Sequence, residues 1–115
     1  MADCLFCKLV AGEIPARIAR RTDDAVAFHD IDPKAPVHVL VIPTAHVPAV
    51  RDAEGPEGKA MLGRLLQFAA EVAADLGVDA GGYRIVTNTG PDAGQSVDHL
   101  HFHVLGGRRM TWPPG

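Results

Sequence analysis

The sequence has little of what marks several large classes of protein. Aromatic residues make up 5 % of its 115 residues and there are only two cysteines, too few for a disulfide-rich secreted scaffold. No apolar run approaches the roughly 18 residues of a membrane-spanning helix, and the N-terminus lacks the basic start and apolar core of a signal peptide. A formal net charge of −3 argues against binding to a nucleic-acid backbone. We therefore expect a cytoplasmic protein that has neither a membrane nor a nucleic acid as partner.

What is present fits one domain over residues 1–115, because 47 % of the residues are hydrophobic and 22 % are charged. Periodicity and turn residues predict a short helix over 4–10, strands over 16–22, 25–29 and 37–43, a long helix over 57–76 closed by Gly77, and strands over 83–88 and 97–105. This order predicts an α+β domain with a five-stranded antiparallel sheet, one long helix and one short helix. Edge strands of such sheets often pair with a second subunit, so a sheet continued across a homodimer is one expectation.

The most informative pattern is a row of three histidines near the C-terminus. His99, His101 and His103 alternate with apolar residues, and residues two apart in a strand share a face. The opposite face would then carry Leu100, Phe102 and Val104. Single strand histidines are usually surface or core residues, and a purely metal-binding row is another alternative. Neighbouring rings on one face are roughly 6–7 Å apart, so one zinc ion would take two of them and leave one free.

The two cysteines form a Cys4-x-x-Cys7 pair. In a reducing compartment such a pair more often consists of thiols or metal ligands than of a structural disulfide. From the residues alone, zinc binding, redox chemistry and two small packed thiols on the short helix all remain open.

Several segments together resemble one known family. The run from His99 to Leu105 fits the signature of the histidine triad (HIT) superfamily, three histidines alternating with hydrophobic residues. The similarity extends over nearly the whole chain, to GEIPA at 12–16, FHDI at 28–31, APVHVLVIP at 35–43, GQSV at 94–97, GGR at 106–108 and WPPG at 112–115. These segments resemble the nucleoside phosphoramidase branch, also called histidine triad nucleotide-binding proteins, more than the dinucleoside polyphosphate hydrolases.

The resemblance implies an enzyme that hydrolyses purine nucleoside 5′-phosphoramidates through a covalent nucleotidyl-histidine and releases the nucleoside monophosphate. His101, in the middle of the row, matches the nucleophile of the family, and a backbone carbonyl would select its tautomer. His99 and His103 would supply hydrogen bonds or positive charge to the phosphoryl oxygens. His38 matches a fourth histidine near the phosphate, and Ser96 would hold or protonate the leaving amine.

The resemblance also implies which residues bind the nucleotide. Asp30 matches the aspartate that accepts hydrogen bonds from the ribose hydroxyls, although its place before Pro33 also suits an ordinary turn. Phe28 and Ile31 would form an apolar slot for the base. The residues that would contact the phosphate lie in or beside the glycine-rich loop: Asn88, Gly94, Gln95 and Ser96.

A structural zinc ion is implied as well, and no organic cofactor. Bacterial-type members of the family that carry the cysteine pair bind zinc, and members without the cysteines dispense with it. By this resemblance the ligands would be Cys4, Cys7, His46 and His99, a tetrahedral set of two thiolates and two imidazoles. A zinc-bound His99 would not be free to donate to a phosphate.

Two other functions stay open beside the phosphoramidase. The same nucleophile could hydrolyse dinucleoside polyphosphates, which the segments 106–108 and 112–115 disfavour, or the chain could be a nucleotide-binding regulatory module with incidental catalysis. The resemblance further implies a homodimer in which the tail 106–115 reaches the partner's site. Asp98 stands where an aromatic residue is common in animal members, and strand alternation predicts it on the face opposite the histidines.

Overall fold

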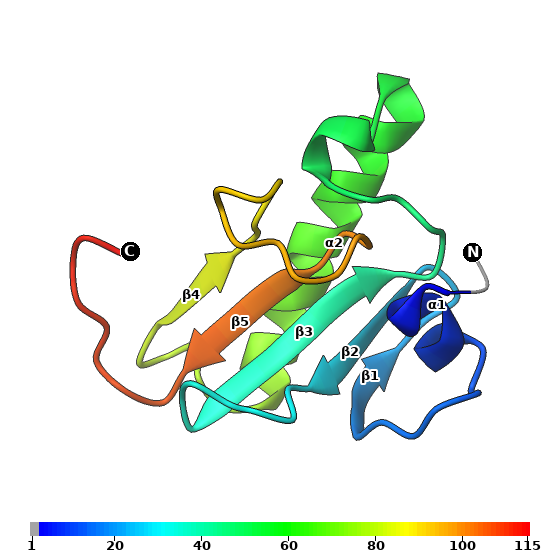
Figure 1. The fold of residues 1–115 in the computed structure, drawn as a ribbon. Helices are drawn as coiled ribbons and strands as arrows, with labels where there is room; N and C mark the ends of the chain where they lie inside the picture. The colour runs from blue at the N-terminus through cyan, green and yellow to red at the C-terminus, as the bar shows by residue number, and fades with distance from the viewer. Residues whose placement is uncertain (1–2) are drawn as a thin grey trace.

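The computed structural model describes residues 3–115. Its elements are α1 (Leu5–Val10), β1 (Ile18–Arg21), β2 (Ala25–His29), β3 (Val37–Pro43), the short 3-10 helix η1 (Val50–Asp52), α2 (Gly55–Asp75), β4 (Tyr83–Val86) and β5 (Phe102–Gly106). The strands form one antiparallel sheet in the order β1-β2-β3-β5-β4 (Figure 1). This confirms the predicted α+β class, with five strands, one long helix and one short helix. Within residues 3–115 no helix combines the length and hydrophobicity needed to cross a membrane.

The two helices cover opposite faces of the sheet (Figure 1). The larger hydrophobic core joins α2 to β2, β3 and β5, and it includes Leu65, Phe68 and Val72, which lie on one face of the helix at spacings of three and four. The smaller core joins α1 to the other face of the sheet. There Phe6 of α1 meets Phe28 of β2 edge to face, with ring centroids 5.4 Å apart. The apolar face of α2 is therefore packing surface, and the α1 face of the sheet carries a smaller core that leaves room for polar residues beside it.

The strand β3 is buried on both faces because its successive side chains alternate between these two cores. Val39 and Val41 pack toward α2, while Leu40 and Ile42 pack toward α1. His38 lies two residues before Leu40 and therefore shares the α1 face. One strand thus supplies both the packed core and one of the polar side chains that gather on the α1 face.

The end of α2 follows the predicted glycine signal. Gly77 adopts a φ of 76°, a left-handed conformation that glycine reaches without a steric penalty. Its N–H donates to the Ala74 carbonyl, and the N–H of Val78 donates to the Ala73 carbonyl. These two bonds form a Schellman motif, which satisfies carbonyls that the helix end would otherwise leave unpaired.

The strand predicted over 97–105 is wrong in its first half, because β5 begins only at Phe102. The backbone groups before that residue bond outside the sheet. The Leu100 N–H donates to a carbonyl of the loop before η1, and the His101 carbonyl accepts from the Thr87 hydroxyl at 2.9 Å. A strand needs its backbone N–H and carbonyl groups for hydrogen bonds to the neighbouring strands. The segment is therefore extended without being part of the sheet.

Three smaller differences follow from local structure. Asp98 lies exposed in a bend, so the prediction that strand alternation sets its direction is wrong. The strand predicted over 83–88 ends at Val86. The sequence did not indicate η1, a single turn whose three residues carry no helical periodicity to detect.

Candidate active site

The α1 face of the sheet gathers four histidines. His38 of β3 and His103 of β5 lie on neighbouring strands with ring centroids 5.2 Å apart, and the rings of His101 and His103 are also 5.2 Å apart. His99 and His101 both meet the ring of Phe6 edge on, at 5.9 and 5.3 Å. The alternating apolar residues Leu100, Phe102 and Val104 lie in the core under α2. The predicted separation of imidazoles from apolar side chains is therefore confirmed.

His101 is held in one tautomer. Its ring is buried, and its Nδ1 lies 2.7 Å from the backbone carbonyl oxygen of His99. A carbonyl oxygen only accepts hydrogen bonds, so Nδ1 must carry the proton and donate it. The lone pair of the neutral imidazole is then on Nε2, which is the arrangement that a nucleophilic histidine requires.

The peptide between His99 and Leu100 is fixed from both sides. Its carbonyl accepts from His101, and its N–H donates to the Val47 carbonyl at 2.6 Å. The carbonyl of His101 itself accepts from the Thr87 hydroxyl at 2.9 Å. The backbone that orients the His101 ring is therefore tied both to the segment after β3 and to the segment after β4.

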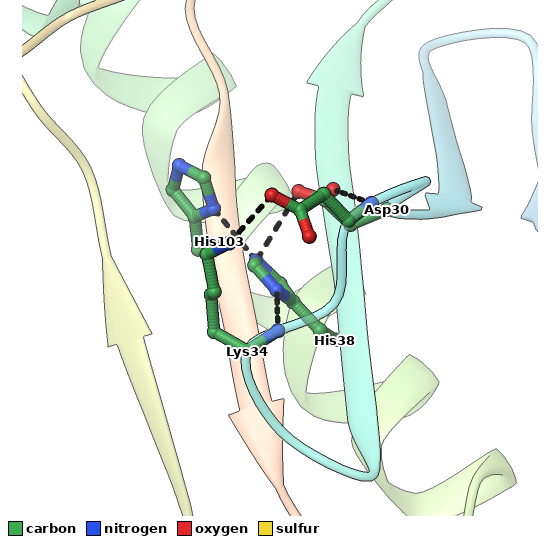
Figure 2. Close-up of polar contacts among 5 residues, drawn as sticks. Asp30, Lys34, His38 and His103 are labelled. Carbon is green, nitrogen blue, oxygen red and sulfur yellow. Dashed lines mark hydrogen bonds and ion pairs between the residues drawn. The ribbon is translucent and has the colours of Figure 1, made fainter.

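A second chain of hydrogen bonds fixes His38 and His103 (Figure 2). The backbone N–H of Lys34 donates to His38 Nδ1 at 3.0 Å, so the proton of a neutral His38 ring is on Nε2. That Nε2 lies 2.9 Å from His103 Nδ1, which must then accept the bond. The proton of a neutral His103 is therefore on its own Nε2, and this histidine is a hydrogen-bond donor at that atom.

Both rings of this relay are neutral near pH 7. Burial, together with the neighbouring His101 and His38 rings, lowers the pKa of His103 to about 4. Burial also lowers the pKa of His38, although the nearby Asp30 carboxylate opposes that shift. Of the two contributions that the resemblance allows, the relay therefore favours hydrogen bonds from neutral imidazoles over positive charge.

Asp30 follows the end of β2, beside the relay (Figure 2). Its Oδ1 accepts from the Asp32 backbone N–H at 2.8 Å, which is the bond of an Asx turn. Its Oδ2 lies 3.4 Å from His38 Nε2. The turn interpretation of this residue is thus correct, and the same half-buried carboxylate also adjoins the polar site.

Asp30, His38 and His103 place one donor atom each within 4.8 Å of one another, which is close enough to surround a metal ion. The protonation pattern argues against that use. Because His38 Nδ1 already accepts from the Lys34 amide, Nε2 carries the proton and offers no lone pair to a metal. We therefore interpret this group as a hydrogen-bond relay.

A different group joins α1, the loop after β3 and the histidine row. Cys4, Cys7, His46 and His99 place their Sγ and Nδ1 atoms within 4.8 Å of one another. His99 Nδ1 is 3.4 Å from Cys4 Sγ and 3.6 Å from Cys7 Sγ, and His46 Nδ1 is 3.2 Å from Cys7 Sγ. A tetrahedral zinc ion, with Zn–S near 2.3 Å and Zn–N near 2.0–2.1 Å, separates such atoms by about 3.6 Å. The four donors are therefore already spaced for zinc.

The tautomer of His99 also suits a metal ligand. Its Nε2 lies 3.0 Å from the Pro43 carbonyl oxygen and must donate to it, so the lone pair is on Nδ1 and faces the thiols. An imidazole ligand whose other nitrogen donates to a backbone carbonyl is usual at zinc sites. Burial and the hydrogen bond with Cys4 raise the pKa of the Cys7 thiol. A bound cation would reverse that effect by stabilising the thiolate.

The glycine-rich loop before the histidine row is organised by Gln95. Its Oε1 accepts from the Gly90 N–H at 2.9 Å, and its Nε2 donates to the carbonyls of Pro48 and Val97 at 2.7 and 3.1 Å. Gly94, with a φ of 80°, donates its N–H within the same turn. The Gln95 amide therefore shapes the loop, a role that the sequence did not indicate.

Two further predicted residues lie around this loop. Ser96 is exposed and lines a surface pocket of about 470 Å³ that it shares with Cys4, His46 and Asp98. Asn88 is half-buried in the segment between β4 and the loop. Ser96 is thus brought beside the cysteine and histidine group.

The two residues predicted to line a base slot differ in exposure. Phe28 is buried against Phe6, whereas Ile31 is fully exposed in the turn after β2. Ile31 directly follows Asp30, whose carboxylate adjoins His38, so its exposed side chain is accessible to a ligand.

Sequence reasoning missed three contributors to the site. Lys34 acts through its backbone N–H, which no side-chain pattern can reveal, and Thr87 acts through a hydroxyl 14 residues before its partner. Phe6 packs on both His99 and His101. A signal for Phe6 did exist, because it is an aromatic residue placed between the two predicted metal ligands of the short helix.

Comparison with known proteins finds relatives that cover nearly the whole chain. An uncharacterized HIT-like protein of Synechocystis sp. is 50 % identical over 113 residues, which cover 98 % of this chain and 97 % of that protein. A 14 kDa zinc-binding protein of Brassica juncea is 45 % identical over 119 residues, covering 98 % of this chain and 100 % of that protein. The crystal structure of a HIT family hydrolase from Legionella pneumophila matches with a TM-score of 0.94 and 43 % identity, covering 98 % of this chain and 100 % of that one. The HIT domain family model matches residues 11–110, and the chain therefore belongs to the HIT family.

Proposed function

We propose that this protein hydrolyses the P–N bond of purine nucleoside 5′-phosphoramidates through a covalent nucleotidyl-histidine at His101, releasing the nucleoside monophosphate. The observation that carries the proposal is the 2.7 Å bond from His101 Nδ1 to the His99 carbonyl, which leaves the Nε2 lone pair available. The similarity to a HIT family hydrolase supports hydrolysis as the reaction class.

In the first step His101 Nε2 attacks the α-phosphorus, and the bond from phosphorus to the amine nitrogen breaks. The departing nitrogen takes up a proton, a task that we assign to the Ser96 hydroxyl. The positive charge that develops on the His101 ring is stabilised through Nδ1–H by the His99 carbonyl. His103 donates from Nε2 to a phosphoryl oxygen, as the hydrogen bond from His38 prepares it to do.

In the second step water attacks the phosphorus and the bond to His101 Nε2 breaks. The water oxygen remains on the monophosphate with one of its protons, and the other proton returns to the Ser96 oxygen, which gave up its own in the first step. The His101 ring returns to its neutral form with Nε2 free. The nucleotide is positioned by residues assigned by resemblance: Asp30 for the ribose hydroxyls, Phe28 and Ile31 for the base, and Asn88 and Ser96 for the phosphate. Gly94 and Gln95, which the resemblance also assigns to the phosphate, act by shaping the loop, because their N–H groups already donate within the protein.

We further propose a structural zinc ion at Cys4, Cys7, His46 and His99. Zinc bound there supplies a cross-link between α1 and the two histidine segments. The sulfur–nitrogen distances of 3.2 to 3.6 Å support this assignment, as does the zinc-binding relative from Brassica juncea. Cysteines must stay reduced to bind zinc, which suits a reducing compartment such as the cytoplasm.

A homodimer that pairs two copies of β4 completes the proposal. β4 is an edge strand of the sheet, and Trp112 in the C-terminal tail is 83 % exposed. An unpaired strand edge and an exposed aromatic side chain are both features that a second copy can cover. The tail 106–115 would then reach the partner's site.

Mass spectrometry of protein quenched during turnover of an adenosine 5′-phosphoramidate tests the reaction. We expect an adenylyl adduct on His101 and release of adenosine monophosphate. His101→Ala should give neither, while binding the monophosphate within about tenfold of the unsubstituted protein. His29→Ala is the matched control, because His29 ends β2 outside the hydrogen-bond relay.

Each other outcome points to a different conclusion. Turnover by His101→Ala, or an adduct on another residue, would remove His101 from the nucleophile role. Faster hydrolysis of diadenosine polyphosphates than of the phosphoramidate would reassign the substrate class. Binding of the monophosphate with neither adduct nor product would favour a regulatory nucleotide-binding module.

A further inference from the structure

The peptide that orients His101 is held between two members of the cysteine and histidine group. His46 and His99 each directly precede one partner of the 2.6 Å bond between the Val47 carbonyl and the Leu100 N–H. The same peptide presents its carbonyl to His101 Nδ1 at 2.7 Å. A cross-link between His46 and His99 therefore joins the two segments that hold this peptide, whose carbonyl fixes the His101 tautomer.

The cysteines contact the same place through α1. Cys4 caps the helix by accepting from the Cys7 N–H at 3.3 Å. Phe6 lies between them in the sequence, and its ring packs edge on against His99 and His101. A change at the cysteines is thus transmitted to the His101 ring both by the ligand contacts of His99 and by the packing of Phe6.

The two thiols are also placed to react with each other. Residues three apart in a helical turn have Cα atoms roughly 5 Å apart, within the 4.4–6.8 Å range of disulfides. Cys4 and Cys7 are both free thiols and only half-buried. Cys4 lines a surface pocket of about 470 Å³, which admits a small oxidant such as hydrogen peroxide.

We propose that Cys4 and Cys7 are a peroxide-sensitive thiol pair that controls the nucleophile, an inference that rests on the proposed role of His101. Hydrogen peroxide takes two electrons from the two sulfurs: the S–S bond forms, the O–O bond breaks, and the oxygens leave as two water molecules. The two further protons that this needs come from the thiols or, where the sulfurs would be zinc-bound thiolates, from solvent. The disulfide sulfurs no longer act as thiolate ligands alongside His46 and His99. The two segments then separate, and the His99 carbonyl no longer holds the His101 proton on Nδ1.

The experiment uses the full, zinc-loaded protein treated with hydrogen peroxide. Zinc release is followed with a colorimetric chelator. The tautomer of His101 is followed by nitrogen-15 NMR of the protein without nucleotide. We expect one zinc ion released for each disulfide formed, loss of the Nδ1–H preference of His101, and at least about a tenfold slower formation of the nucleotidyl adduct. A thiol reductant with added zinc should restore all three.

The variant Cys4→Ser with Cys7→Ser cannot form the disulfide and lacks two of the proposed zinc ligands, so it mimics the oxidised protein. Before any peroxide is added it should already show the loss of the Nδ1–H preference of His101 and the slow adduct formation, and peroxide should change neither. A disulfide that forms with zinc release while the His101 tautomer is unchanged would overturn the inference, as would thiols that survive peroxide intact. If the untreated protein forms no adduct, the proposed function fails, and the NMR response alone decides the inference.

Discussion

His101 and His103 stand side by side with ring centroids 5.2 Å apart, and their hydrogen bonds place the protons on opposite ring nitrogens. His101 donates from Nδ1 to a carbonyl, whereas His103 accepts at Nδ1 from His38. At the corresponding Nε2 atoms, the first ring offers a lone pair and the second an N–H. In the proposed mechanism, the nucleophile and the oxyanion donor are therefore set next to each other before any ligand arrives.

His38→Ala tests whether the relay is needed for turnover. The substitution removes the ring that donates to His103 Nδ1, so the two tautomers of His103 become closer in energy. We expect kcat to fall by about 10- to 100-fold with little change in KM, because an oxyanion donor acts mainly in the transition state. Steady-state kinetics and the nitrogen-15 NMR signals of His103 are the measurements. An unchanged kcat together with an unchanged His103 tautomer would show that the relay has no role.

The stability of the fold should decrease on acidification through the His103 ring. Its pKa is about 4 in the folded protein, lowered by burial and by His101 and His38, against about 6.5 for an unfolded chain. Between these values the unfolded state binds more protons, so the free energy of unfolding rises with pH up to about 6.5 and falls below it. His103 alone contributes up to about 3 kcal/mol of this loss between pH 7 and pH 4.

Chemical denaturation at a series of pH values measures that dependence. His103→Gln removes the titrating group while keeping a side chain of similar length, and it should flatten the curve between pH 4 and pH 6.5. A curve of the same slope in the variant would assign the acid sensitivity to other groups, of which His38 is the first to test because burial lowers its pKa too.

Loss of the cysteines should release the metal and weaken the fold. Cys4→Ser with Cys7→Ser removes two of the four proposed ligands, and the link from α1 to His46 and His99 is lost with them. We expect bound zinc to fall from about one ion per chain to none, and Tm to drop by at least about 5 °C. Elemental analysis and calorimetry check both. Unchanged Tm in protein shown to lack zinc would exclude a stabilising metal.

Two glycines of α2 provide a test of the fold that is independent of chemistry. At Gly63, which is exposed, an added methyl group meets no atom within 4 Å, so Gly63→Ala should stabilise the protein by about 0.5–1 kcal/mol through helix propensity. At Gly58 the same methyl group would lie 2.3 Å from the Ala53 carbonyl carbon. Gly58→Ala should therefore destabilise by about 1–3 kcal/mol. Thermal unfolding of the two variants, side by side, should show changes in stability of opposite sign.

The sequence predicted the strands β2 and β3 to the residue, because both are continuous apolar or β-branched runs with turn residues at their ends. It predicted equally well that the three histidines lie on the side opposite Leu100, Phe102 and Val104. Side chains alternate in this way in any extended backbone, whether or not the backbone is part of a sheet. It placed the start of β5 five residues too early. The backbone groups of that segment are taken by Val47, Thr87 and the His101 ring, and such contacts lie far away in the sequence.

The site itself was predictable only in part. The Cys4, Cys7, His46 and His99 group draws on residues up to 95 positions apart, and only the family resemblance suggested that they meet. The selection of tautomers depends on three backbone groups, at His99, Lys34 and Pro43. Every residue carries such groups, so composition and spacing contain no sign of which ones are used.

The alternation along β3 has a practical consequence for anyone who alters this protein. Val39 and Val41 point into the layer under α2, while His38 lies on the other side of the same strand. The sheet therefore separates a side that only packs from a side that carries both packing and the polar site. Libraries restricted to the α2 side can be selected for thermal stability without touching the histidines. Libraries on the α1 side need a screen for stability as well as for a new substrate, because the smaller core and the proposed zinc ligands lie there.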